Sequence, residues 1–285
     1  MNGAHLSDRL GCSTITFRKR SFTDALEAIS KLGLHEIDLG MLPGVCEHVP
    51  IPTTNADIDA AVRACNDARL TVRTVNADSG DLAGPGRFAA LEQIDALARL
   101  TKALDAKALV LPCGPHKTLG LEPADEAGVD AMIAVLAESL TKAGEIAARY
   151  GVRLLVEALH IGRLCSSATR AYALLDRVPN ESCGVVLDVS HVVAVGDDLL
   201  AYTRGVAART EHVHLRDAAP GNINLSIGRG TIDFAAFIAS LAARDYPGNY
   251  ILELETHDIA EHERETVARA SAEFISNILS FAVAR

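Results

Sequence analysis

The sequence lacks paired cysteines, a membrane-spanning apolar run and an excess of positive charge. Its six cysteines are scattered without a Cys-x-x-Cys motif, which excludes a zinc ribbon and a disulfide scaffold and predicts buried free thiols. No apolar stretch is long enough to span a membrane, and Met1–Gly11 has no apolar run, so we expect a soluble, cytoplasmic protein. The formal net charge of −10 disfavours nucleic acid and membranes as partners and favours small molecules.

The sequence also has no segment typical of a linker between domains. The 285 residues contain no Ser/Pro-rich tract, low-complexity segment or charge run that would divide them, and a hydrophobic content of 49% is enough for a large core. We therefore expect one domain over residues 1–285.

Short apolar runs alternate with longer segments of helical periodicity, which is the pattern of β-α units in a parallel sheet. The strands are predicted at Arg9–Phe17, Glu36–Leu39, Thr71–Asn76, Ala108–Cys113, Val152–Leu159, Gly184–Val189, Glu211–Leu215 and Tyr250–Glu255. The helices are predicted at Phe22–Leu32, Ala56–Arg69, Phe88–Leu104, Ala124–Tyr150, Ala168–Val178, Leu199–Ala207, Ile232–Arg244 and Ala260–Leu279. Eight consecutive units are most simply a single closed (β/α)8 barrel. The alternative is a doubly wound open sheet, but the Gly-x-Gly-x-x-Gly motif typical of its first strand is missing.

Residue types that bind metals stand at the ends of four consecutive predicted strands. These positions hold Glu157, then Asp188 and His191, then His212 and His214, and finally Glu253 and Glu255. Active sites of such barrels are built at the C-terminal ends of the strands. A carboxylate is costly to bury unpaired, so a shared metal ion is predicted. Residues two apart on a strand face the same way, which leaves either histidine and either glutamate of the last two strands open as ligands.

The types of these residues also reduce the number of candidate metal ions. Three carboxylates and one imidazole suit a hard or borderline divalent ion, so we expect Mn²⁺ or Mg²⁺, with Zn²⁺ or Co²⁺ as alternatives.

Five stretches together resemble the xylose isomerase-like TIM barrels, the sugar phosphate isomerase/epimerase group that includes AP endonuclease family 2. They read LLVE to Glu157, VVLDVSH to His191, HVHLRD to Asp217, LSIGRGTIDF to Phe234 and YPGNYILE to Glu253. The resemblance implies a metal held by Glu157, Asp188, His214 and Glu253, with His191 near the metal or bonded to the substrate. It selects the second histidine of His-x-His and the glutamate five residues beyond Gly248.

The chain departs from that family at two places. The endonuclease branch has an Asp-x-His pair before the glycine-rich loop, where this chain has Asn222-Ile223-Asn224, so a trinuclear zinc site is not expected. Keto-sugar epimerases often carry an arginine shortly after the strand-seven histidine. Here Arg216, on the same strand face as His214, is a candidate substitute for gripping a carboxylate or hydroxyl.

We therefore expect a divalent-metal-dependent sugar or sugar phosphate isomerase or epimerase that acts through an enediolate on a small polyhydroxylated carbonyl compound. Glu157 and Glu253 are the predicted general base and acid. His191, Arg216 and His116 are the predicted substrate-binding residues.

Three alternatives remain. The first is a dehydratase of a keto-polyol or a dehydroshikimate-like acid on the same scaffold. Endonuclease IV-type DNA repair and a non-catalytic sugar-binding barrel rank below it, and a homo-oligomer is compatible with each. Asp38, in the second predicted strand, either reaches into the barrel or caps the following turn.

Overall fold

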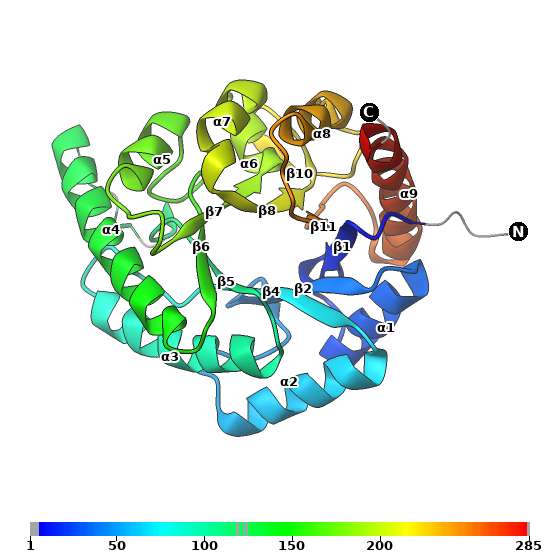
Figure 1. Cartoon of the computed structure of the whole chain (residues 1–285), viewed down its shortest axis with the longest axis horizontal. Helices are drawn as coiled ribbons and strands as arrows, with labels where there is room; N and C mark the ends of the chain where they lie inside the picture. Colours follow the sequence, from blue (N-terminus) through cyan, green and yellow to red (C-terminus); the bar gives the residue numbers. More distant parts are fainter. Residues whose placement is uncertain (1–5, 118–119, 122, 124, 284–285) are drawn as a thin grey trace, which may run out of the picture.

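The structure, a computed structural model that describes residues 6–117, 120–121, 123 and 125–283, is a closed parallel barrel ringed by helices (Figure 1). The barrel strands are β1 (Leu10–Ser13), β2 (Glu36–Leu42), β4 (Thr71–Ala77), β5 (Ala108–Pro112), β6 (Arg153–Glu157), β7 (Gly184–Asp188), β8 (Thr210–Leu215) and β11 (Tyr250–Leu252). They pair in parallel in the order β1-β11-β8-β7-β6-β5-β4-β2, and β1 also pairs with β2. This last pairing closes the ring, which confirms the predicted (β/α)8 barrel and excludes the open sheet.

The helices surround the strands. They are α1 (Phe22–Leu32), α2 (Asn55–Ala68), α3 (Arg87–Ala103), α4 (Glu126–Ala148), α5 (Ala168–Leu175), α6 (Val189–Ala194), α7 (Leu199–Val206), α8 (Phe234–Ala242) and α9 (Arg264–Val283), with 3-10 turns at Thr14–Phe17, Ala207–Arg209 and Glu261–Glu263. Outside the ring, β3 (Cys46–Glu47) extends β2 in the antiparallel direction, and β9 (Asp217–Ala219) forms a hairpin with β10 (Asn222–Leu225).

Helix α1 shows how the sequence specifies these elements. The Ser21 side chain accepts a hydrogen bond from the backbone N–H of Asp24 and caps the first turn. Leu26 and Ile29 are fully buried on its inner face. Gly33 ends the helix at a φ of 83°, a left-handed conformation that glycine adopts without strain. The helix therefore has the predicted bounds, whereas the predicted start of α4 at Ala124 lies outside the described residues.

The barrel interior changes from apolar to polar along the strands. Ala108, Val110, Leu155 and Val186 form a separate apolar cluster. Residues two apart on a strand share a face, so Glu157 and Asp188, which follow two of these residues, form the next layer of the interior. The packed lower layer supports the polar layer above it at the carboxyl ends of the strands.

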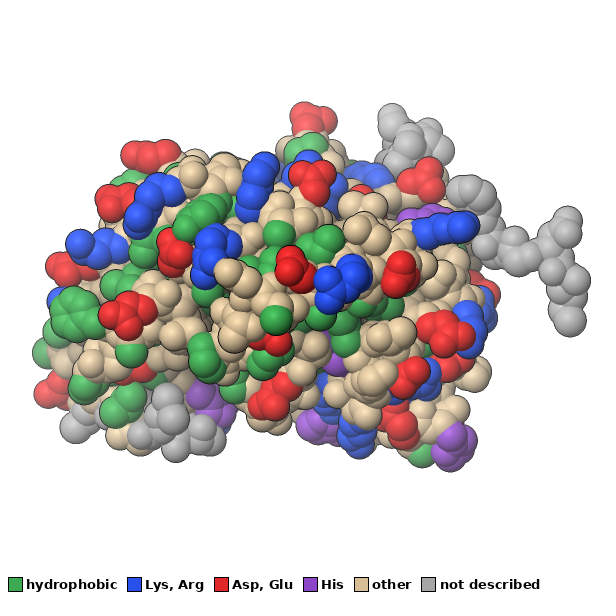
Figure 2. Space-filling view, turned by 90° about the horizontal axis from the view of Figure 1, so that it is seen from below, with side chains coloured by type: hydrophobic (Ala, Val, Ile, Leu, Met, Phe, Trp, Pro, Cys, Tyr) green, Lys and Arg blue, Asp and Glu red, His purple; other side chains and the backbone are tan. Residues whose placement is uncertain are grey.

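The cysteines, the helices and the surface charges complete the description. All six cysteines are free and buried, as predicted. Among the described residues, no helix combines the length and apolar character needed to cross a membrane. Acidic and basic side chains are interspersed over the face seen in Figure 2.

Candidate active site

A cavity of about 240 Å³ lies at the carboxyl ends of the strands. Its walls include His191 of α6 and residues within strands or directly after them: Leu42, Asn76, Pro112, Glu157, Arg216 and Glu253. This is the end of the barrel where the sequence predicts an active site.

Asp188 has two roles, one for each carboxylate oxygen. It ends β7 and caps α6, because Oδ1 accepts hydrogen bonds from the Ser190 N–H at 2.7 Å and the Ser190 hydroxyl at 2.6 Å. The other oxygen, Oδ2, is buried and accepts no hydrogen bond from any described residue. The cap fixes the side chain so that Oδ2 faces Nη2 of Arg216 at 3.6 Å and Nε2 of His191 at 3.7 Å, in ion-pair contact but without a hydrogen bond.

Glu157 and Glu253 are both buried, at 7% and 6% exposure. Glu157 ends β6, and its Oε1 lies 3.3 Å from Nε2 of His191. Glu253 directly follows β11, and its Oε1 accepts a hydrogen bond from Nδ2 of Asn76 at 3.1 Å. Glu255 is 25% exposed at the side chain and pairs with arginines instead.

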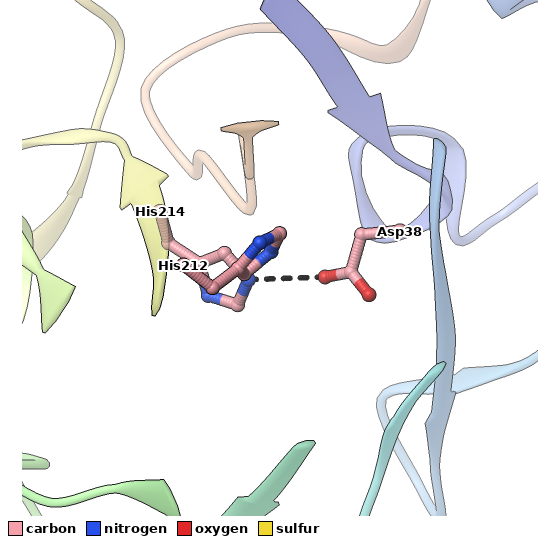
Figure 3. Close-up of side chains that lie close together, drawn as sticks. All are labelled: Asp38, His212 and His214. Atoms are coloured by element: carbon pink, nitrogen blue, oxygen red, sulfur yellow. Dashed lines mark ion pairs between the residues drawn. The ribbon is translucent and has the colours of Figure 1, made fainter. Parts of the chain in front are cut away.

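His214 is fully buried on β8 between two carboxylates. Its Nδ1 lies 3.4 Å from Oε1 of Glu253. Its Nε2 lies 3.0 Å from Oδ2 of Asp38, which reaches into the barrel from β2 (Figure 3). Asp38 thus adopts the first of its two predicted placements. The neighbouring His212 contacts Thr74 rather than the cavity carboxylates.

The hydrogen bonds around His191 define its tautomer. The backbone N–H of Ile161 donates to Nδ1 at 3.3 Å, so the proton of the neutral ring is on Nε2, which faces Glu157. His160 stacks on this ring with centroids 3.8 Å apart. Burial is the main cause that lowers the pKa of His191 well below its usual value, helped by the charge of Arg216. A ring with its Nε2–H toward the cavity is a hydrogen-bond donor rather than a metal ligand.

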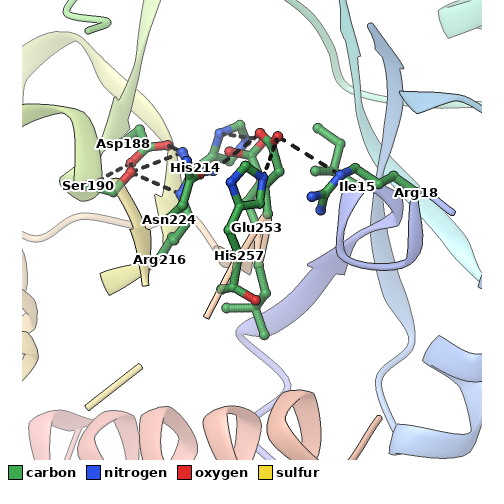
Figure 4. Close-up of polar contacts among 12 residues, drawn as sticks. Ile15, Arg18, Asp188, Ser190, His214, Arg216, Asn224, Glu253 and His257 are labelled. Carbon is green, nitrogen blue, oxygen red and sulfur yellow. Dashed lines mark hydrogen bonds and ion pairs between the residues drawn. The ribbon is translucent and has the colours of Figure 1, made fainter. Parts of the chain in front are cut away.

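Arg216 is buried to 1% exposure and fixed on several sides (Figure 4). Its Nε and Nη2 donate to the Ser190 hydroxyl at 3.2 and 3.1 Å, and its Nη1 lies 3.4 Å from Oε2 of Glu255. His116 lines the cavity too, where it forms a β-bridge with Arg163. The three predicted substrate-binding residues therefore surround one cavity.

The crowding of acids changes their protonation. Burial first, then the charges of Asp188 and Glu253, raises the pKa of Glu157 well above its usual value. Burial also raises the pKa of Glu253 to about 7, although His214 opposes the shift. Burial disfavours a charged His214, but the carboxylates of Glu253 and Asp38 outweigh it and raise its pKa to about 10.

The donor atoms fit a metal ion. One donor atom each from Glu157, Asp188 and His214 lies within 4.8 Å of the others. Oε1 of Glu157, Oδ2 of Asp188 and Nδ1 of His214 are buried and have no hydrogen-bond partner among the described residues. Buried polar atoms normally have partners, and oxygen atoms with one imidazole nitrogen suit a hard or borderline divalent ion.

Fold and site together define a TIM barrel with a carboxylate and histidine cluster, able to hold a metal, at the carboxyl ends of its strands. The chain belongs to the xylose isomerase-like TIM barrel family, which it matches over residues 26–278. It is 30% identical over 222 residues to a proposed hydroxypyruvate isomerase of Streptomyces coelicolor, an alignment that covers 71% of this chain and 76% of that protein.

Two other similarities are more distant. An inosose dehydratase of Clostridium perfringens is 27% identical over 138 residues, which cover 42% of this chain and 46% of that protein. The crystal structure of D-psicose 3-epimerase with D-tagatose from Clostridium cellulolyticum H10 has a TM-score of 0.77 at 17% identity, covering 95% of this chain and 99% of that one. At this identity the structural likeness concerns the fold.

The sequence patterns missed three residues that support the site. Asn76, which bonds Glu253, is a polar residue near the end of an apolar strand, and the same signal drew attention to Glu157. Ser190 links Asp188 to Arg216, but a serine beside an aspartate has no distinctive pattern. Thr74 bonds Asp38, a contact that only the closed barrel reveals.

Proposed function

We propose that the chain is a divalent-metal-dependent isomerase or epimerase of a small, uncharged polyhydroxylated carbonyl compound, working through an enediolate. The observation that carries this proposal is the set of buried donor atoms of Glu157, Asp188 and His214, which lie close together and have no hydrogen-bond partner among the described residues. The similarity to a proposed hydroxypyruvate isomerase supports the reaction class.

The metal would be held by Glu157, Asp188, His214 and Glu253, with Mn²⁺ or Mg²⁺ favoured over Zn²⁺ or Co²⁺. Such an ion polarises a carbonyl group, lowers the pKa of the neighbouring C–H and stabilises the resulting enediolate oxygen.

The two glutamates supply the proton transfers. Glu157 comes from β6 and Glu253 from the end of β11, with β7 and β8 between them in the ring. They therefore approach the cavity from different directions. One carboxylate removes the proton from carbon, and the other carboxyl group returns a proton to the opposite face or to the neighbouring carbon.

Three further side chains orient the substrate. His191 offers its Nε2–H to a substrate oxygen, and the tautomer is fixed by Ile161. Arg216 has little freedom to move, because Ser190 and Glu255 hold it, so its guanidinium group is a preorganised donor for a hydroxyl. His116 contributes to the cavity wall.

The charges of the cavity favour an uncharged substrate. Each of its two arginines is already paired: Nη2 of Arg163 lies 2.6 Å from Oδ2 of Asp78, and Arg216 contacts Glu255. The acidic residues of the wall are Asp78, Glu157, Glu253 and Glu255, with Asp188 directly behind them. The four carboxyl groups of the wall outnumber its two arginines, which disfavours phosphates and carboxylic acids.

A dehydratase is the second candidate, supported by the similarity to inosose dehydratase. It would begin with the same proton abstraction and continue with loss of a hydroxyl group from the adjacent carbon. His116 or Arg216 would then assist the departing hydroxyl.

The test is incubation of the Mn²⁺-loaded protein with uncharged ketoses and inososes in D₂O, followed by mass spectrometry. An isomerase or epimerase gives an isomer that carries deuterium, whereas a dehydratase gives a product lighter by one water. Glu157→Gln should lower turnover by about 10²- to 10⁴-fold while Mn²⁺ still binds. Glu27→Gln, an exposed control on α1, should leave turnover unchanged, and full activity of Glu157→Gln would refute the proposal.

A further inference from the structure

A chain of contacts crosses the barrel interior behind the cavity. The Thr74 hydroxyl donates to Oδ1 of Asp38 at 2.9 Å, and Nε2 of His212 lies 3.3 Å from the same hydroxyl oxygen. The other oxygen of Asp38 faces Nε2 of His214 at 3.0 Å. Asp38, Thr74, His212 and His214 are all buried at 2% exposure or less, so water does not replace these contacts.

The direction of each hydrogen bond follows from the number of protons available. Thr74 has one hydroxyl hydrogen, and Asp38 receives it, so His212 must donate its Nε2–H to the threonine oxygen. The other oxygen of Asp38, Oδ2, lies in ion-pair contact with Nε2 of His214, without the geometry of a hydrogen bond. A carboxylate this close favours a proton on Nε2. In the neutral ring, which is the form that binds a metal, the lone pair is then on Nδ1, the nitrogen on the side of Glu253.

We propose that Asp38 is a positioning residue that keeps the His214 proton on Nε2 and presents Nδ1 to the metal. A ligating histidine commonly donates its other N–H to a carboxylate, and loss of such a partner weakens metal binding by about 10- to 100-fold. The inference rests on the metal site proposed above. The proposed ligands come from β6, β7, β8 and β11. Asp38 comes from β2, which β1 and β11 separate from the His214 strand, β8, in the ring.

Asp38→Asn tests the tautomer directly. As long as His212 donates to the Thr74 oxygen, the Thr74 hydrogen needs an acceptor, so the amide oxygen faces Thr74 and the amide NH₂ faces Nε2 of His214. This NH₂ group requires a lone pair on Nε2, which moves the ring proton to Nδ1 and blocks the metal-binding nitrogen. We expect Mn²⁺ to bind about 10- to 100-fold more weakly.

Adding Thr74→Val should partly reverse this loss. Without the threonine hydroxyl, the amide can rotate and turn its oxygen toward Nε2 of His214, which restores the ligating tautomer. The double variant should therefore bind Mn²⁺ more tightly than Asp38→Asn alone, although it is less stable. A purely structural role for Asp38 predicts the opposite, a further loss of affinity with the second substitution.

The measurement is titration of metal-free protein with Mn²⁺, following the electron paramagnetic resonance signal of the unbound ion, with thermal unfolding recorded in parallel. Thr101→Val is the matched control, because Thr101 is also fully buried but its hydroxyl bonds Leu97 within α3. It should lower stability without changing Mn²⁺ affinity.

The outcomes separate the two proposals. Wild-type affinity in Asp38→Asn, or a double variant that binds no better than Asp38→Asn, would overturn the role of Asp38 while leaving the metal site intact. If Asp38→Asn does not fold, weaker Mn²⁺ binding by Thr74→Val than by Thr101→Val supports the role, and equal binding overturns it. Failure of the wild-type protein to bind Mn²⁺ would refute the proposed metal function itself.

Discussion

Removal of the metal should lower thermal stability by an amount that depends on metal concentration. The reason is that Glu157, Asp188 and His214 each bury a polar atom without a hydrogen-bond partner among the described residues. An ion that binds only the folded state adds about 2.7 kcal/mol at 100 times its Kd. An unfolding entropy of about 2.1 cal/mol/K per residue gives roughly 0.6 kcal/mol/K for 285 residues. The Tm should therefore rise by about 5 °C.

Differential scanning calorimetry of chelator-treated protein over a Mn²⁺ series measures this shift. Well above Kd, each tenfold increase in Mn²⁺ should add about 1.4 kcal/mol, or about 2 °C. Asp188→Asn is the control: its amide oxygen can keep the α6 cap, but the loss of the charged oxygen should make its Tm respond less to Mn²⁺. A wild-type Tm that is independent of Mn²⁺, or an undiminished response in Asp188→Asn, would show that these atoms do not hold the ion.

Two further predictions concern charge and packing. Glu255→Gln removes one of the two carboxylates that contact Arg216, the other being Asp188. The ratio of hydroxypyruvate to dihydroxyacetone affinity should therefore rise about tenfold in calorimetric titrations; an unchanged ratio would contradict the charge basis of the neutral-substrate proposal. Gly230→Ala places a Cβ against the Asp217 carboxylate and should cost about 1–3 kcal/mol in urea unfolding, whereas Gly86→Ala, whose new Cβ meets only ordinary contacts, should be nearly neutral. Equal effects of the two alanines would argue against overpacking.

The alternation of short apolar runs with helical segments made the barrel predictable, and the polar residues at the ends of these runs indicated part of its inner layer. Glu157 and Asp188 interrupt apolar runs at strand ends, and a buried carboxylate has few explanations other than a partner of opposite charge. The sequence pattern therefore identified candidate ligands before their distances were known. Their roles as ligands stay a prediction.

Helix α6 could not be predicted in the same way. Its six residues, Val189–Ala194, are too few to show a clear helical period. The sequence predicts the aspartate that caps it, Asp188, only as a metal ligand. The two oxygens of Asp188 separate these roles.

Long-range partners were also beyond the sequence pattern. Period-two alternation places Glu253 and Glu255 on one face, but only the structure shows that the first lies beside His214 and the second beside Arg216. Likewise, no local pattern connects Asp38 with His214. Their contact depends on the closure of the ring through the β1–β2 and β1–β11 pairings.

The closed ring divides the site between the two halves of the chain. The four proposed ligands lie between Glu157 and Glu253, whereas the side chains that orient two of them, Asp38 and Asn76, come from β2 and β4. The second half of the chain, which contains all four proposed ligands, thus depends on the first half for the contacts that hold His214 and Glu253 in place. A substitution at Asp38 or Asn76, far from the ligands in sequence, should therefore weaken metal binding while the barrel still folds.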